Sequence, residues 1–227
     1  MDFRYVDIFF QIIVFLFAIS VHESAHAWMA NRCGDPTAKM LGRITLNPLK
    51  HIDPFGTVIL PAIGLFSGIG MLGWAKPTPV TIENFRDKVK GDILTTAAGP
   101  ISNFILVLIA LAVLSVLYLA TPLHHGEVIN ILQGEGISDS ALLPVAWFFF
   151  RALYINVLLG IFNLIPVPPL DGSHILRHAL PEPILRVYDN VGMVGLVLLF
   201  IFGGSLIAAL VRPPMFFFHR FLLGVSQ

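Results

Sequence analysis

The chain has 227 residues, of which 56% are hydrophobic and only 12% are charged. A soluble domain normally carries about 25% charged residues, so this composition excludes an ordinary soluble protein and predicts a polytopic membrane protein. Fourteen Lys and Arg residues balance fourteen Asp and Glu residues, which argues against nucleic acid as a partner, and the single cysteine excludes an internal disulfide or a cysteine-based metal cluster.

The first apolar segment runs from Val6 to about Met29, long enough to cross about 30 Å of hydrocarbon as a helix. Near its end lies the pattern His-Glu-x-x-His, formed by His22, Glu23 and His26. Two imidazoles four residues apart share one helix face and suit a zinc ion, and the Glu beside the first suits activation of a water. Ionisable groups in an apolar helix are costly, so we interpret these three as functional residues.

The next stretch is polar, and residues 37–46 are predicted to form short cytoplasmic strands. Residues 56–72 are apolar again but contain a proline and several glycines. We therefore predict a re-entrant or bent hairpin there, which does not cross the membrane. The prolines of residues 76–80 predict an extended segment.

Three further apolar segments follow, at residues 93–119, 144–164 and 191–211. The segment at residues 144–164 contains one charge, Arg151, which we expect to reach the nearer membrane surface. The predicted fold class is an all-α polytopic membrane protein with about four full transmembrane helices, a re-entrant apolar hairpin and short cytoplasmic strands. It is predicted to be a single membrane-embedded domain over residues 1–227, with a core at 6–172, the extra span at 191–211 and an interfacial tail at 212–227.

The basic residues orient the chain. Eight of the fourteen Lys and Arg residues lie between the first and second clean spans, and the loop at residues 120–143 has none. The positive-inside rule then places His22 and His26 at the cytoplasmic end of their helix.

Asp171 is the best-placed third metal ligand. It follows a span that also runs toward the cytoplasm and that ends in several prolines. Irregular backbone at membrane depth is tolerated only where it is buried in protein or lines a wet cavity. Two crossings separate His26 from Asp171 if residues 56–72 do not cross, so both can face one compartment. The alternative is a helix-ending Asp-Gly turn.

The motifs resemble those of the site-2 protease family of intramembrane zinc metalloproteases. They are His22-Glu23-x-x-His26, Gly99-Pro100-x-x-Asn103 and Asn163-x-x-Pro166-x-Pro168-Pro169-x-Asp171-Gly172. Two more stretches look like the compact bacterial and archaeal branch of that family: Asn47-Pro48-x-Lys50-His51-x-Asp53-Pro54 and Gly73-Trp74-Ala75-Lys76-Pro77. The resemblance covers most of the chain, although we recognise no PDZ or CBS domain in it.

This resemblance implies that His22, His26 and Asp171 are zinc ligands and that Glu23 is the general base. It also implies hydrolysis of peptide bonds in or beside transmembrane segments of membrane proteins. We expect a prokaryotic cell membrane and an active site at its cytoplasmic side. The sequence does not predict the oligomeric state.

Asn103 and Asn163 are amides near helix ends and are candidate donors to the oxyanion of the reaction. Hydrogen bonding between helices, or helix capping, is an equal alternative for both. Segment 76–80 or the strands at 37–46 are candidates for pairing with an unwound substrate.

Two other functions remain open at this point. One is a zinc-binding membrane scaffold or pseudoprotease without proteolysis; the other is a metal transporter, which would need more polar residues along its spans. Among the other polar residues, His174 and His178 are predicted to form a solvated helix face. His51 and Asp53 either support a metal ligand or structure their loop.

Overall fold

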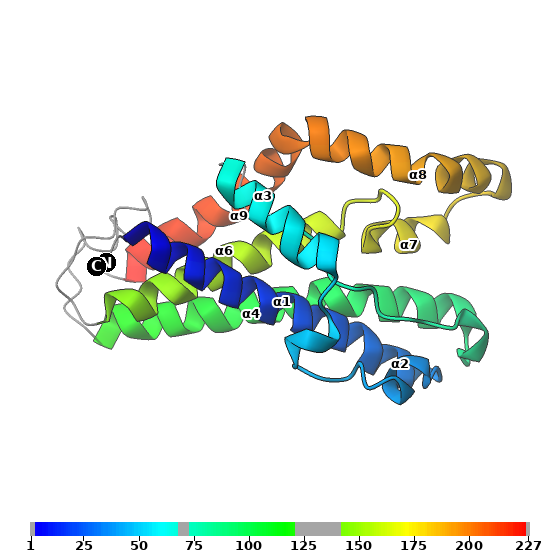
Figure 1. Ribbon diagram of the computed structural model, residues 1–227, viewed down its shortest axis with the longest axis horizontal. Helices are drawn as coiled ribbons and strands as arrows, with labels where there is room; N and C mark the ends of the chain where they lie inside the picture. Colours follow the sequence, from blue (N-terminus) through cyan, green and yellow to red (C-terminus); the bar gives the residue numbers. More distant parts are fainter. Residues whose placement is uncertain (1–2, 68–72, 121–141, 226–227) are drawn as a thin grey trace.

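The structure is a computed structural model that describes residues 3–67, 73–120 and 142–225. The regular secondary structure of these residues is entirely helical (Figure 1). Three of the described helices are long and apolar enough to cross a membrane: α1 (Phe3–Cys33), α4 (Lys88–Ala120) and α6 (Leu143–Asn163). They match the first three predicted spans, and the chain is an integral membrane protein.

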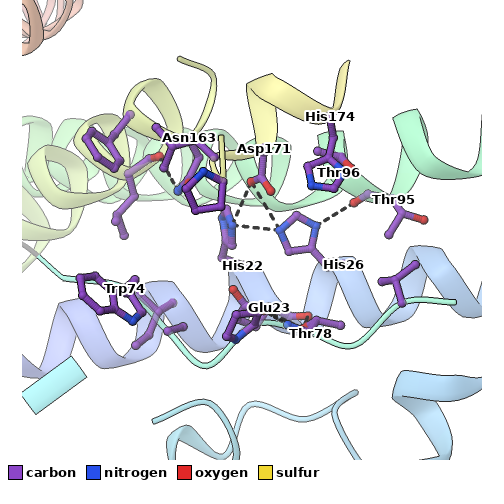
Figure 2. Close-up of a pocket in the computed structure, with 18 of the residues that line it drawn as sticks. His22, Glu23, His26, Trp74, Thr78, Thr95, Thr96, Asn163, Asp171 and His174 are labelled. Carbon is purple, nitrogen blue, oxygen red and sulfur yellow. Dashed lines mark hydrogen bonds and ion pairs between the residues drawn. The ribbon is translucent and has the colours of Figure 1, made fainter. Parts of the chain in front are cut away.

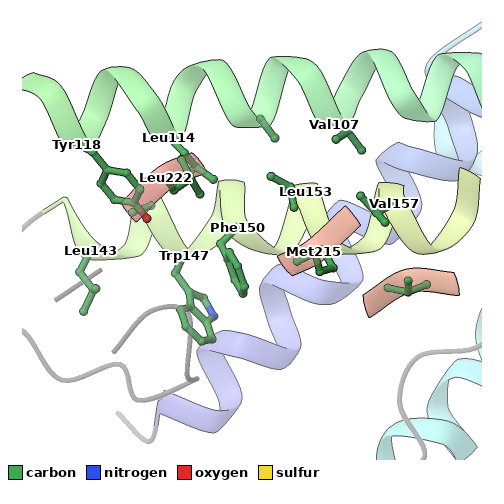
Figure 3. Close-up of a cluster of buried hydrophobic side chains, with 13 residues drawn as sticks. Val107, Leu114, Tyr118, Leu143, Trp147, Phe150, Leu153, Val157, Met215 and Leu222 are labelled. Atoms are coloured by element: carbon green, nitrogen blue, oxygen red, sulfur yellow. The ribbon is translucent and has the colours of Figure 1, made fainter. Parts of the chain in front are cut away.

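Helix α4 packs against both α1 and α6 along the long axis of the molecule (Figure 1). The core between α4 and α6 is filled by side chains such as Leu114, Trp147 and Leu153, each at most 1% exposed (Figure 3). Large apolar side chains also cover the outer faces of these helices, including Phe9 and Leu108. Since lipid is as apolar as these side chains, association of the helices depends on close packing and on buried polar contacts.

One such polar contact joins α1 to α6. The carboxylate of Asp7 accepts hydrogen bonds from Arg151 Nε at 2.6 Å, from Arg151 Nη2 at 2.8 Å and from Trp147 Nε1 at 2.7 Å. Arg151 is thus paired within the protein, and its reach to the membrane surface stays a prediction. A carboxylate on the neighbouring helix offers the guanidinium a two-pronged partner inside the protein.

The predicted strands at residues 37–46 are also absent. Residues Thr37–Met40 form a single helical turn, α2, which Gly42 follows with a φ of +67°. The carboxylate of Asp35 accepts hydrogen bonds from the Thr37 backbone N–H at 3.1 Å and from the Thr37 hydroxyl, which favours a helical turn at this point. The polar stretches on either side of the next apolar segment each contain one short 3₁₀ helix, Pro48–Lys50 and Ile82–Asn84.

The apolar stretch that follows is helical and short. A π-helix, Pro54–Ile59, continues into α3 (Leu60–Ser67), and at 1.5 Å per residue these eight residues of α3 span only about 12 Å. Asp53 caps this helix by accepting hydrogen bonds from the backbone N–H groups of Phe55 and Gly56. Residues 68–72 lie outside the described residues, so the hairpin at 56–72 stays a prediction.

The expected fourth span at residues 191–211 is two helices instead of one. Helix α8 (Glu182–Phe202) ends at Gly203, and α9 (Gly204–Val225) begins directly after it. Most of the expected interfacial tail belongs to α9, where Val211, Met215 and Leu222 are buried against the core (Figure 3). These residues recur at helical spacing, so they form one apolar face that packs on α4 and α6.

Candidate metal centre

Three side chains converge on one point between α1 and α7 (Asp171–Arg177) (Figure 2). His22 Nε2 and His26 Nε2 are 3.0 Å apart, as expected for two residues one helical turn apart. Asp171 Oδ2 lies 3.2 Å from His22 Nε2 and 3.5 Å from His26 Nε2. The structure thus brings together the His pair and the distant carboxylate that the sequence singled out.

The other ring nitrogen of each histidine is held by a hydrogen-bond acceptor. His22 Nδ1 lies 2.7 Å from Asn103 Oδ1, and His26 Nδ1 lies 2.7 Å from the backbone oxygen of Thr95. Both acceptors require an N–H at Nδ1, so in the neutral imidazoles each Nε2 carries a lone pair. Two lone pairs and the Asp171 carboxylate therefore face one another, an arrangement that a cation would stabilise.

The spacing of these atoms fits zinc. Ligands that bind zinc tetrahedrally at about 2.0–2.1 Å lie roughly 3.3 Å from one another. The three distances among His22 Nε2, His26 Nε2 and Asp171 Oδ2 are 3.0, 3.2 and 3.5 Å. Two nitrogens and one oxygen are also a donor set that zinc takes in catalytic sites, where a fourth position remains for water or substrate.

Two glycines of the motifs permit this close approach. A Cβ atom at Gly99 on α4 would lie 2.3 Å from His26 Nε2 and 2.6 Å from His22 Cε1. A Cβ atom at Gly172 would lie 2.2 Å from the backbone oxygen of Leu164 at the end of α6. Without side chains at these positions, α4 can pack on the His pair and α7 can begin directly against α6.

Glu23 lies beside the two histidines and is held by Thr78. One ligand atom from each of His22, Glu23 and His26 lies within 4.8 Å of the others. Glu23 Oε2 accepts hydrogen bonds from the Thr78 backbone N–H at 2.8 Å and from the Thr78 hydroxyl at 2.7 Å (Figure 2). A carboxylate held by two donors on the same oxygen has a fixed orientation.

The segment that carries Thr78 is irregular and anchored by backbone contacts. The Arg43 guanidinium donates to the backbone oxygens of Lys76 and Pro77, and the Lys76 N–H donates to the backbone oxygen of His51 at 2.8 Å. His51 is fully buried, and its Nε2 donates to the backbone oxygen of Thr45 at 2.9 Å. His51 and Asp53 thus structure the loop, which was one of their two interpretations.

A cavity of about 660 Å³ opens beside the three converging atoms. It is lined by the side chains of Glu23, Asn163 and Asp171 and by residues of the irregular segment before and around Thr78, among them Trp74 and Pro77 (Figure 2). Its lining is largely apolar, which is typical of ligand cavities with a few placed polar groups.

The two asparagines predicted as oxyanion donors differ in placement. Asn163 lines the cavity, and its Nδ2 donates one hydrogen bond to the backbone oxygen of Leu159 on its own helix at 3.0 Å. Asn103 is fully buried; its Oδ1 faces His22, and its Nδ2 donates to Asn156 Oδ1 at 2.9 Å. The amide of Asn103 is thus engaged on both sides, away from the cavity.

Several polar residues of the site were missed from the sequence. His178 Nε2 lies 2.7 Å from Asp92 Oδ2, and His174 Nδ1 lies 3.6 Å from Asp92 Oδ1, so these histidines turn toward α4. Both histidines stay partly exposed, in line with the predicted solvated face, but the sequence did not predict their contact with the buried carboxylate of Asp92 on α4. One feature of the sequence could have identified Asp92 and Asn156 as candidate site residues, because each is a polar residue in or beside an apolar span.

Comparison with known proteins agrees with this site. The sequence profile described as Peptidase family M50 matches residues 10–202. The chain is 32% identical over 195 residues to a Bacillus subtilis protein named "Putative zinc metalloprotease YwhC", covering 85% of this chain and 80% of that protein. It is 30% identical over 181 residues to "Putative zinc metalloprotease Rip2" of Mycolicibacterium smegmatis, covering 78% of this chain and 61% of that protein.

A shorter match, 42% identical over 81 residues, relates 34% of this chain to 18% of "Protease RseP" from Yersinia pestis. No solved structure matches the chain significantly. The chain belongs to peptidase family M50, the site-2 protease family. It is accordingly a metalloprotease by family, and zinc is its metal.

Proposed function

We propose that the chain is an intramembrane zinc metalloprotease that hydrolyses peptide bonds in or near transmembrane segments of membrane proteins. In this proposal His22, His26 and Asp171 hold the zinc, and Glu23 is the general base. The observation that carries it is the convergence of three lone-pair atoms, 3.0–3.5 Å apart, with a carboxylate beside them and a cavity in front. All of these groups lie on or next to helices long enough to cross a membrane.

Zinc in this site supplies a Lewis acid that makes water a nucleophile near neutral pH. Glu23 accepts the proton of the attacking water and passes it to the leaving amine. Both hydrogen bonds from Thr78 go to Oε2 of Glu23, so we assign the proton transfer to Oε1. The Thr78 hydroxyl also lies 3.0 Å from the Glu23 backbone oxygen, so its single proton is shared between the side chain and the backbone of Glu23.

Asn163 is the remaining candidate for stabilising the oxyanion. Its amide nitrogen carries two N–H groups, and one of them donates to Leu159. The second N–H is the donor that we assign to the developing negative charge, because Asn163 lines the cavity. For Asn103 we propose a different role, which is developed in the next subsection.

The substrate is proposed to be a transmembrane protein that enters the site from the lipid bilayer. A helical substrate has to be unwound before its carbonyl is accessible, and residues 76–80 lie along the cavity as an irregular segment that an unwound chain could pair with. Residues 37–40 are not available for such pairing, because they form a helical turn. From the distribution of Lys and Arg we propose that the site opens to the cytoplasmic side of a prokaryotic cell membrane.

Glu23→Gln tests the function, because it removes the base and keeps the shape of the side chain. We expect the purified variant to retain zinc, and cleavage of model single-span substrates to fall by about 10²–10⁴-fold, the usual contribution of a general base. Glu83→Gln, at an exposed position of a 3₁₀ helix, is the matched control. A Glu23→Gln variant that cleaves at the wild-type rate would overturn the proposal. Zinc binding without cleavage by the wild-type protein would favour a scaffold instead.

A further inference from the structure

A chain of side-chain hydrogen bonds crosses three membrane-spanning helices and ends at His22. His22 Nδ1 on α1 lies 2.7 Å from Asn103 Oδ1 on α4. Asn103 Nδ2 donates to Asn156 Oδ1 on α6 at 2.9 Å, and Asn156 Nδ2 donates to the backbone oxygen of Ala152 at 2.8 Å. Asn103 and Asn156 are 0% and 2% exposed, so water cannot replace either partner.

The far end of this chain sets the direction of every hydrogen bond in it. The backbone oxygen of Ala152 can only accept, so the amide nitrogen of Asn156 has to face it. The amide oxygen of Asn156 then faces Asn103, which has to present its own nitrogen to Asn156 and its oxygen to His22. Reversing the amides would bring two acceptors together in a buried place and leave a polar group unsatisfied, which is unfavourable.

The direction of the hydrogen bonds selects one tautomer of His22. Asn103 Oδ1 requires an N–H at Nδ1, so the neutral ring carries its lone pair at Nε2. Nε2 is the atom that lies 3.2 Å from Asp171 Oδ2 in the proposed metal site. The second ligand, His26, needs no such chain, since its Nδ1 lies against the backbone oxygen of Thr95.

We propose that Asn156 is a positioning residue for the metal site: acting through Asn103, it holds His22 in the tautomer that offers Nε2 to zinc. The inference rests on the proposed role of His22 as a zinc ligand. It assigns a function to Asn156, which lies outside the motifs of the family resemblance and two helical turns before Asn163. It also explains why a costly amide sits at the fully buried centre of an apolar helix.

The alternative is that the two asparagines merely join α4 to α6. Hydrogen bonds between membrane helices contribute to stability whatever else they do, so a loss of stability alone would not distinguish the two roles. The test therefore has to read the tautomer of His22 directly, in zinc-free protein, and to include a substitution that keeps the acceptor. Asn156→Leu removes the acceptor at similar volume. Asn156→Asp keeps an oxygen toward Asn103 in either protonation state.

The tautomer is read from the ¹⁵N resonances of the imidazoles in zinc-free, histidine-labelled protein, with His22 identified by its loss in His22→Ala. In the wild type and in Asn156→Asp we expect the proton at Nδ1. In Asn156→Leu we expect a substantial population with the proton at Nε2. Zinc affinity, measured by competition with a chelator, should fall about tenfold in Asn156→Leu and stay within about twofold of the wild type in Asn156→Asp.

Ser115→Ala controls for the loss of a polar contact on a span, since its hydroxyl donates to the backbone oxygen of Leu111 on the same helix. If Asn156→Leu does not fold, Asn156→Ala removes the same acceptor without adding bulk. Wild-type tautomer and zinc affinity in a variant that lacks the acceptor would overturn the inference, as would equal losses in Asn156→Asp. If His22→Ala binds zinc as tightly as the wild type, the proposed ligand set fails instead.

Discussion

Gly99→Ala tests whether the close packing of α4 on the His pair is what assembles the site. The added Cβ would lie 2.3 Å from His26 Nε2, whereas ordinary contacts begin at 3.4 Å, so something has to move by about 1.1 Å. Zinc sites tolerate about 0.2 Å in their ligand distances. If the histidines move, the displacement is roughly five times this tolerance.

The other way to relieve the contact is for α4 to move away. The hydrogen bonds from His22 to Asn103 and from His26 to Thr95, now 2.7 Å each, would then lengthen to about 3.8 Å and be lost. Either route disorders the ligands. We expect zinc affinity to fall at least about tenfold, equivalent to about 1.4 kcal/mol.

Zinc affinity is measured by competition with a chelator, and thermal unfolding of the zinc-free protein is followed in parallel. Replacing glycine by alanine within a helix adds about 1 kcal/mol of stability, which offsets only part of the cost of the clash, so we expect some loss of thermal stability beside the loss of zinc affinity. Gly204→Ala is the matched control, because its Cβ meets no atom within 4 Å. Unchanged zinc affinity in Gly99→Ala would refute this reasoning.

Two further predictions concern carboxylates outside the metal site. Asp92→Asn should weaken the contact of α7 with α4 through His174 and His178 and lower zinc affinity several-fold. The control is Asp189→Asn, which breaks an exposed ion pair with Arg177 and should change neither zinc affinity nor thermal unfolding. Although burial opposes it, hydrogen bonds from Asn84, Thr37 and Thr81 hold the pKa of Asp35 below its ordinary value of 3.8. The stabilisation that Asp35 contributes is therefore complete above pH 3.8 and is lost as the pH falls through the lowered pKa. Thermal unfolding measured from pH 7 to pH 3 should show this loss of stability at the acidic end. The loss of stability should be smaller in Asp35→Asn.

Local sequence predicted the parts of the site that depend on short-range geometry. The spacing of His22 and His26 places them on one helix face wherever that helix lies, and three uninterrupted apolar segments are each long enough to span a bilayer. Asp171 was also predicted from the sequence, because the number of crossings decides which helix ends face the same compartment. These arguments needed no tertiary contact.

The errors arose where distant residues decide the local structure. The hydrogen bonds that favour a helical turn at residues 37–40 come from Asp35, which is itself held by Thr81 and Asn84, more than forty residues away. The apolar stretch at 191–211 is different, because it contains Gly203 and Gly204, a local signal for a helix end that the prediction of one span did not use; α8 ends at Gly203.

The roles of the asparagines could not be assigned from spacing alone. Asn103 and Asn163 were both expected near helix ends, but Asn103 lies in the interior of α4 and only Asn163 ends its helix. The rotation of each helix then decides that Asn103 faces His22 and that Asn163 faces the cavity. The direction of the hydrogen-bond chain from Ala152 to His22 likewise appears only once α4 and α6 are placed side by side.

The most direct test of the account is the zinc X-ray absorption spectrum of the purified protein, recorded for the wild type and for Asp171→Ala. We predict one zinc per chain, bound by two imidazoles and by oxygen at about 2.0–2.1 Å, with no sulfur ligand, and loss of zinc or of one oxygen ligand in the variant. A sulfur ligand at about 2.3 Å, or an unchanged zinc environment in Asp171→Ala, would contradict the proposed site.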